Sequence, residues 1–264
     1  MHKRLIFEGV LLILIFGSVW GIFTLFPIRP QKTSSVFSVE KEEKLGNLLL
    51  KATLADPDFR EADNDTLSAA IDIIKERLTG SLEGSRYTYS IVLVNNDMAN
   101  AFALPGGYLL ITTGLMAIMN SPEECAAVVA HEIGHIEKKH TIGKLLANFT
   151  AAILITDNSL ASEAAEMLTT SAYSRRQEEA ADRFGLSLLE KSKINPHIMG
   201  TAFRHLKEAP GSYDLKAEII QSHPNIDSRI RNAYDYPVIE SFAEEDLRID
   251  WESVKRQVTH PKSQ

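Results

Sequence analysis

The chain has 264 residues, 44% of them hydrophobic and 24% charged, which is enough for one good-sized domain with modest appendages. The formal net charge of −7 lacks the basic excess of nucleic-acid-binding proteins, so no nucleic-acid partner is expected. The single cysteine, Cys125, excludes an intramolecular disulfide, and its apolar neighbours predict a small core residue.

The first apolar stretch of the chain predicts a membrane anchor over residues 1–27. Residues 9–26 carry no charge, follow Lys3 and Arg4, and end at Pro27. As a helix they would extend roughly 27 Å, close to the hydrocarbon thickness of a bilayer. The length and the poor cleavage site favour one uncleaved transmembrane helix. The alternative is a signal sequence that is cleaved, with secretion to the periplasm.

The side of the membrane is not decided by the basic residues, because they lie both before and after the predicted span. A short basic N-terminal tail commonly stays in the cytosol. An extracytoplasmic, periplasmic location is therefore expected for the rest of the chain.

After a polar linker over residues 28–38, the chain predicts a mainly helical domain over 39–236 and a polar C-terminal tail over 237–264. β-Branched and aromatic residues predict three strands at 87–94, 101–104 and 108–112, with a Pro-Gly-Gly turn between the last two. Apolar periodicity predicts helices at 39–55, 66–79, 121–140, 142–155, 162–168, 174–191, 196–207 and 224–234. The expected fold class is therefore α+β, with a small sheet.

The sequence His131-Glu132-Ile133-Gly134-His135 is an HExxH motif. Residues four apart on a helix differ by about 40° and 6 Å, so both imidazoles can bind one cation. Zinc lowers the pKa of a bound water towards 7, and Glu132 would take its proton and pass it to a leaving amine. The motif predicts a zinc hydrolase. The simpler alternative is two histidines on an exposed helix face.

A catalytic zinc needs a third protein ligand. His140 follows His135 by five residues and is expected on another face near the helix end, where it would interact with the helix dipole. Glu178 and Asp182 share a helix face, so one could bind metal while the other accepts a hydrogen bond from a ligating histidine. Alternatively, these acids are solvated and pair with neighbouring arginines.

The HExxH motif is preceded by Asn-Ala-Phe-Ala-Leu-Pro-Gly-Gly at residues 100–107 and followed about forty residues later by a Ser-Arg-x-x-Glu-x-x-Ala-Asp pattern. His223-Pro224 and Arg229 come after this pattern. These four motifs, in this order, resemble family forty-eight of the metallopeptidases, the HtpX, CaaX-prenyl-protease and Oma-like zinc proteases. In this family the first motif is a strand and turn beside the cleft, and the last is a His-Pro…Arg segment. The resemblance covers about residues 85–235 and implies a zincin-type (gluzincin) protease domain.

The resemblance also implies roles for individual residues. It places one catalytic zinc ion on His131, His135 and Glu178, with Glu132 as the base. Asp182 falls on the family's supporting acid.

Further positions are carried over with less defined roles. His223 would stabilise the oxyanion or cap the zinc in a resting state, although from the sequence it could equally cap a surface helix. Arg229 would give transition-state or structural support. An extended substrate would pair by strand addition with Asn100, Ala101, Phe102, Ala103 and Leu104.

With one predicted span, the chain resembles most the single-anchor or periplasmic members without C-terminal repeats. We expect an endopeptidase of protein quality control that acts on unfolded, misfolded or membrane-associated polypeptides. The alternative is a metal-stabilised binding or chaperone module without turnover. Glu132 argues against it, since a structural zinc site needs no base and usually closes with a fourth protein ligand.

Overall fold

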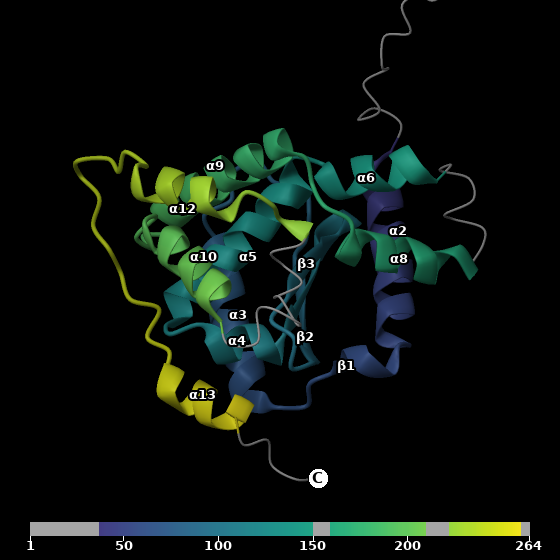
Figure 1. The fold of residues 1–264 in the computed structure, drawn as a ribbon, viewed down its shortest axis with the longest axis horizontal. Helices are drawn as coiled ribbons and strands as arrows, with labels where there is room; N and C mark the ends of the chain where they lie inside the picture. Colours follow the sequence, from purple (N-terminus) through teal and green to yellow (C-terminus); the bar gives the residue numbers. More distant parts are fainter. Residues whose placement is uncertain (1–36, 150–158, 210–221, 260–264) are drawn as a thin grey trace, which may run out of the picture. The chain divides into compact units, whose positions relative to one another are not determined.

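The computed structural model describes residues 37–149, 159–209 and 222–259. A small sheet lies between two layers of helices (Figure 1). Helices α3 (Asp65–Thr79) and α5 (Pro122–Glu137) cover one face, and α2 (Val39–Leu54) and α8 (Ser159–Thr170) cover the other. The predicted mainly helical α+β domain with a small sheet is confirmed.

The sheet consists of β1 (Arg60–Glu61), β2 (Ser90–Asn95), β3 (Ala101–Leu104) and β4 (Tyr108–Thr112). Their order is β1-β2-β4-β3, with β2 parallel and β3 antiparallel to β4, so β3 lies at an edge of the sheet. Because side chains alternate along a strand, Ala101 and Ala103 enter the core against α3 and α5, while Phe102 and Leu104 enter the core against α2 and α8. Both faces of β3 are therefore used for packing.

The other helices are α4 (Thr113–Ile118), α6 (His140–Asn148), α9 (Arg175–Lys191), α10 (Ile198–Glu208), α12 (Ile226–Tyr234) and α13 (Trp251–Thr259), with 3-10 turns η2 (Pro57–Phe59) and η3 (Pro105–Gly107). Each predicted strand and helix overlaps an observed one. The strand β1 and the helix α4 were not predicted, because two and six residues are too few for a periodic apolar pattern. The predicted helix over 142–155 extends in part beyond the described residues.

The two helices that carry the sequence motifs begin at strong capping residues. Ser121 accepts a hydrogen bond from the Glu124 N–H at 3.2 Å, with Pro122 in the first helical position of α5. Ser174 and Gln177 form a reciprocal capping box at the start of α9. These caps fix the first turn of each helix. They therefore also determine the face of the helix on which the motif residues lie.

The turn η3 lies against the N-terminal part of α2. Gly106 has a φ of +77°, and a Cβ at this position would lie 2.6 Å from the Glu43 nitrogen. Only glycine combines this backbone conformation with such a close approach. The predicted Pro-Gly-Gly turn therefore also allows α2 to pack over the end of the sheet.

The predicted single helix over 121–140 is wrong at its C-terminal end. Helix α5 ends at Glu137, and Lys139 has the left-handed φ of 58° before α6 begins at His140. A left-handed residue changes the direction of the chain, and no propensity in the Lys138-Lys139 pair indicates this conformation. His140 is therefore the first residue of α6 and not part of the last turn of α5.

The predicted polar tail over 237–264 also needs correction. Leu247 is 3% exposed, Trp251 is 6% exposed and Val254 is 1% exposed, and all three belong to the main core. The Trp251 indole N–H donates to the Met119 carbonyl at 2.9 Å. Trp251 and Val254 are the buried residues of α13, and Leu247 lies in the chain before it. The surrounding charges obscure these apolar residues in the sequence.

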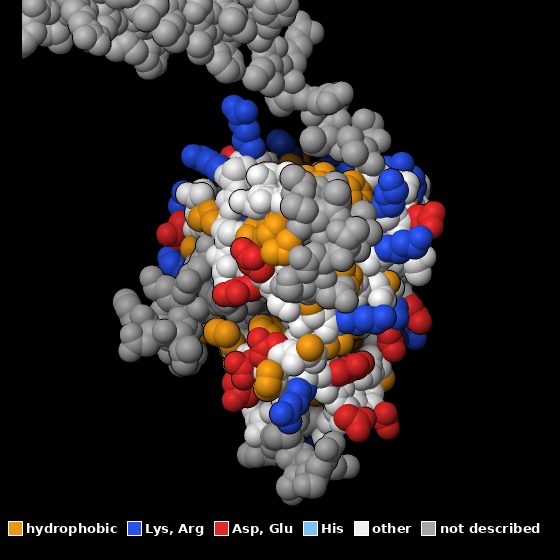
Figure 2. All heavy atoms as spheres, turned by 90° about the vertical axis from the view of Figure 1, so that its right-hand side faces the viewer, with side chains coloured by type: hydrophobic (Ala, Val, Ile, Leu, Met, Phe, Trp, Pro, Cys, Tyr) orange, Lys and Arg blue, Asp and Glu red, His pale blue; other side chains and the backbone are white. Residues whose placement is uncertain are grey.

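The predicted membrane anchor lies outside the described residues. Among the described helices, none is both long and apolar enough to span a bilayer. Seen from the side of α2 and α8, the described surface mixes basic, acidic and hydrophobic side chains (Figure 2).

Candidate metal centre

The motif helices α5 and α9 pack closely, and this contact brings the two sequence motifs together. A Cβ on Gly134 would lie 2.8 Å from the Ala181 carbonyl oxygen, and one on Gly185 would lie 3.1 Å from the His131 nitrogen. Glycine at each crossing point allows the backbones to approach. Residues that are about forty positions apart in the sequence thereby face one another.

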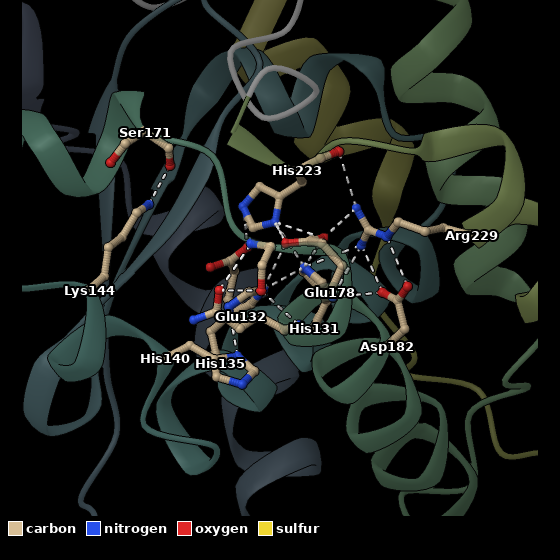
Figure 3. A network of polar contacts seen from close by, with 12 residues as sticks. His131, Glu132, His135, His140, Lys144, Ser171, Glu178, Asp182, His223 and Arg229 are labelled. Atoms are coloured by element: carbon tan, nitrogen blue, oxygen red, sulfur yellow. Dashed lines mark hydrogen bonds and ion pairs between the residues drawn. The ribbon is translucent and has the colours of Figure 1, made fainter. Parts of the chain in front are cut away.

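Four buried side chains converge at this contact: His131 and His135 on α5, Glu178 on α9, and His223 just before α12 (Figure 3). One ligand atom from each lies within 4.8 Å of the other three. Nε2 of His131 lies 3.1 Å from Nε2 of His135, and Nε2 of His135 lies 3.5 Å from Glu178 Oε1. His223 Nδ1 lies 3.1 Å from His131 Nε2 and 3.0 Å from Glu178 Oε1.

A second group of charged side chains supports these donors. Asp182 Oδ1 lies 2.9 Å from His131 Nδ1, so the carboxylate can accept the proton of the nitrogen that faces away from the cluster. Arg229 donates to both oxygens of Asp182, at 2.7 and 2.8 Å, and its Nη1 lies 2.8 Å from Glu178 Oε2. The guanidinium also lies 4.2 Å from the centre of the Phe203 ring. Arg229 thus holds two carboxylates in place.

The electrostatics of the cluster follow from burial and from these neighbours. Burial alone would raise the pKa of Glu178, but His223 and Arg229 lower it to about 2, so this carboxyl is ionised. Burial would likewise raise the pKa of Asp182, and the adjacent Arg229 holds it far below its usual range. Burial and the neighbouring His131 and His223 lower the pKa of His135. A neutral imidazole and an ionised carboxylate are the forms that bind metal.

Glu132 has a different environment, although it is next to His131 in the sequence. It is 1% exposed, and burial raises its pKa to about 7. Neither of its carboxylate oxygens has a hydrogen-bond partner among the described residues, and His223 Nε2 lies 3.5 Å from Oε1. Burying a carboxylate without a hydrogen bond destabilises the folded protein, unless a water molecule or a substrate group supplies the missing hydrogen bonds.

The residues present fit a divalent zinc ion. Tetrahedral zinc with nitrogen ligands at about 2.05 Å requires donor atoms about 3.3 Å apart, close to the spacings between His131, His135 and Glu178. The ionised, buried carboxylates of Glu178 and Asp182 face one buried guanidinium, and this excess of negative charge suits a cation. Imidazole and carboxylate donors are also the set that catalytic zinc sites use.

The second histidine of the motif has supporting residues that sequence reasoning missed. His140 Nδ1 lies 3.2 Å from His135 Nδ1, and the Tyr173 ring lies 4.0 Å from the His135 ring. The Lys144 ammonium lies 3.9 Å from the Tyr173 ring centre and donates to the Ser171 carbonyl (Figure 3). The expected role of His140 at the dipole of α5 is wrong, because the chain turns at Lys139 and brings the ring back to His135.

In the predicted substrate-binding segment, Asn100 to Leu104, the residues after Asn100 form the edge strand β3, which contacts α5. All five side chains are buried, and those of the strand pack into the two cores. Only the outer backbone edge of β3 therefore offers hydrogen-bonding groups for a peptide, since β4 pairs with the inner edge.

The sequence model of peptidase family M48 matches residues 67–236, which include the HExxH helix, Glu178, His223 and Arg229. This match covers more than half of the chain. The chain belongs to peptidase family M48. Membership makes it a metalloprotease hydrolase, as the motifs predicted, and M48 proteases use a metal that is typically zinc.

Three M48 relatives are similar in sequence to parts of the chain. The beta-barrel assembly-enhancing protease of Yersinia pestis is 26% identical over 227 residues, 79% of this chain and 46% of that protein. The mitochondrial metalloendopeptidase OMA1 of Arabidopsis thaliana is 29% identical over 153 residues, 56% of this chain and 31% of that protein. The metalloprotease LoiP of Escherichia coli is 27% identical over 203 residues, 69% of this chain and 79% of that protein. The chain thus spans less than half the length of the first two relatives.

Proposed function

We propose that the chain is a zinc-dependent endopeptidase in which His131, His135 and Glu178 hold the ion and Glu132 is the general base. The proposal is carried by one observation: three buried donors with zinc-like spacing lie beside a buried carboxylate that has no hydrogen-bond partner among the described residues. A structural metal site has no need of such a carboxylate.

The chemistry divides between the metal and the protein. Zinc, when bound, supplies a Lewis acid that makes a water molecule more acidic and polarises the scissile carbonyl. Glu132 would take a proton from the attacking water as the water oxygen bonds to the scissile carbonyl carbon, and it would pass this proton to the amine nitrogen as the C–N bond breaks. Asp182 and Arg229 hold His131 and Glu178 in orientation, and the buried surroundings exclude bulk water.

The proposed substrates are unfolded, misfolded or membrane-associated polypeptides. An extended segment can add to the outer edge of β3, whereas a folded protein rarely offers a free extended strand. The word metalloendopeptidase in the name of one relative supports cleavage within chains. We further propose that residues 1–27 anchor the protein in a membrane with the protease domain on the periplasmic side, a proposal that rests on the apolar stretch over 9–26.

The test compares wild-type full-length protein in detergent with Glu132→Gln, using casein as an unfolded substrate and measuring bound zinc. Wild type should cleave casein and hold about one zinc ion. Glu132→Gln should keep the zinc and lose at least about a hundredfold in kcat, the contribution of a general base. The matched control is Glu179→Gln, whose side chain is 43% exposed and pairs with Arg175, and it should cleave like wild type.

His223 offers a fourth donor, and this favours a second, latent form of the same enzyme. A zinc ion with four protein ligands has no open position for water. If His223 caps the ion at rest, His223→Ala should cleave casein faster than wild type while still binding zinc. Slower cleavage would instead indicate that His223 stabilises the oxyanion. Zinc binding without cleavage in both proteins would favour the binding or chaperone module.

A further inference from the structure

A histidine that binds a metal through one ring nitrogen must carry its proton on the other. For His135 the nitrogen in the cluster is Nε2, which lies 3.1 Å from His131 Nε2 and 3.5 Å from Glu178 Oε1. Nδ1 then carries the proton and points away from the metal position. In proteins such an N–H is almost always given to a hydrogen-bond acceptor, which sets the tautomer and the ring orientation.

The two histidines of the motif meet this requirement in different ways. His131 Nδ1 lies 2.9 Å from the Asp182 carboxylate. His135 Nδ1 lies 3.2 Å from His140 Nδ1, a contact between two imidazoles. Two ring nitrogens at this distance form a hydrogen bond only if one of them carries a proton and the other does not.

We propose that His140 is the positioning residue of His135, accepting its Nδ1–H and thereby selecting the tautomer that binds zinc through Nε2. The opposite direction is excluded when zinc is bound. If His140 donated to His135 Nδ1, the His135 proton would sit on Nε2, and that nitrogen could not bind the ion. This inference rests on the proposed ligand set and adds a residue that supports it.

The backbone around His140 keeps this geometry. Five residues along a continuous helix correspond to a rotation of about 140°, so His140 could not face His135 if α5 continued. The left-handed Lys139 makes the turn, and its ammonium lies 2.6 Å from the Glu42 carboxylate, which is 2% exposed.

The aromatic neighbour of His135 limits the freedom of the ring further. Tyr173 packs against one side of the His135 ring at 4.0 Å and lies 6.3 Å from His140. Its own position is held by Lys144 and by a backbone hydrogen bond to Ser222 at 3.0 Å. The His135 ring is therefore held on its face by Tyr173 and at its edge by His140.

The experiment measures the zinc dissociation constant of the full-length protein by competition with a chromophoric chelator. His140→Ala removes the acceptor and should weaken zinc binding about 10- to 100-fold, the usual effect of losing such a partner. His140→Asn places a carbonyl oxygen close to the position of Nδ1 and should bind zinc within a few-fold of wild type. The matched control is His205→Ala, which removes a histidine bonded to Glu124 at 2.9 Å, away from the cluster, and should leave zinc binding unchanged.

A second readout separates positioning from folding. Long-range 1H–15N NMR of the zinc-loaded wild type should show the His135 proton on Nδ1, and metal-free His140→Asn should melt close to metal-free wild type. The proposal is overturned if His140→Ala binds zinc as tightly as wild type, if His140→Asn is as weak as His140→Ala, or if NMR places the proton on Nε2. Failure of wild type to bind zinc would overturn the proposed metal site instead.

Discussion

Gly134 lies between the two motif histidines in the sequence and at a point where α5 packs closely against α9 in the structure. A single added atom would change the contact between the two helices, because a Cβ on Gly134 would lie 2.8 and 3.0 Å from backbone atoms of Ala181. Backbone atoms cannot move aside as the end of a flexible side chain can. The glycine in the HExxH motif of this chain thus sets the distance between the histidines and Glu178.

We predict that Gly134→Ala separates the two helices and weakens zinc binding by tenfold or more, with a loss of about 1–3 kcal/mol in the free energy of unfolding from overpacking. Isothermal titration with zinc and urea unfolding measure the two effects. Gly143→Ala is the control, since its Cβ would meet no described residue outside its own helical turn within 4 Å, and it should stabilise α6 by up to about 1 kcal/mol. Unchanged zinc affinity in Gly134→Ala would show that the helix contact does not set the ligand spacing.

Tyr89 is another residue whose environment sets its chemistry. It is 9% exposed, and burial and its hydrogen bond to Glu137 at 2.7 Å raise its pKa above the ordinary value of 10.0. The folded state therefore keeps the phenolic proton at a pH where the unfolded chain has lost it. This contribution to stability is complete below pH 10 and decreases as the pH rises above it.

We predict that the free energy of unfolding falls above pH 10 and that Tyr89→Phe reduces this fall. Urea unfolding between pH 8 and 11 measures both proteins. Tyr234→Phe, which removes a phenol that is 39% exposed, serves as the control and should follow the wild-type pH dependence. An equally steep fall in Tyr89→Phe would assign the alkaline sensitivity to other groups.

At the scale of elements, the junction between α5 and α6 determines which residues reach the metal centre. Lys139 in a left-handed conformation costs of order 1–2 kcal/mol, which the surrounding contacts must offset. Its ammonium pairs with Glu42 on α2, and Tyr87 donates to the same carboxylate at 2.7 Å. Helix α2 thus holds the turn that places His140.

We predict that Lys139→Ala destabilises the fold by about 3 kcal/mol, because it leaves the buried Glu42 carboxylate without its cation. The control is Lys44→Ala, which removes an ion pair whose side chains are 72% and 74% exposed and should leave the free energy of unfolding close to that of wild type. Thermal unfolding measures both. Equal effects of the two variants would contradict a structural role for the buried pair.

At the scale of the whole molecule, the helix α13 lies beyond the region that matches the family and completes the main core. It packs against α3 and α4 on the side of the sheet that α5 covers (Figure 1). Its contribution should therefore be to stability more than to the metal centre.

We predict that Trp251→Ala costs about 3–5 kcal/mol in the free energy of unfolding, as is usual for removing a large buried aromatic side chain. The zinc dissociation constant should stay within a few-fold of wild type at a temperature where the variant is folded. Urea unfolding and zinc titration check the two statements. A large loss of zinc affinity in a folded variant would connect α13 to the site.

Local physical rules were sufficient for much of this protein. The apolar periodicity of the helices, the four-residue spacing of His131 and His135, and the β-branched and aromatic residues of the strands act over a few residues. The sequence alone therefore indicated the motif helices, the strands and the two histidine ligands. The pairing of Glu178 with Asp182 was visible as a shared helix face, although the choice between them needed the family resemblance.

Other features depend on contacts between segments far apart in the chain, and only the tertiary structure decided them. The left-handed Lys139, the return of His140 to His135 and the approach of Tyr173 depend on the packing of α6 and α9 against α5 and on the ion pair of Lys139 with Glu42 on α2. The burial of Trp251 depends on a core formed by residues more than a hundred positions earlier. Hydrophobic periodicity and helix capping do not indicate which distant segments come into contact. The free energy that stabilises these contacts arises only when the segments pack against one another.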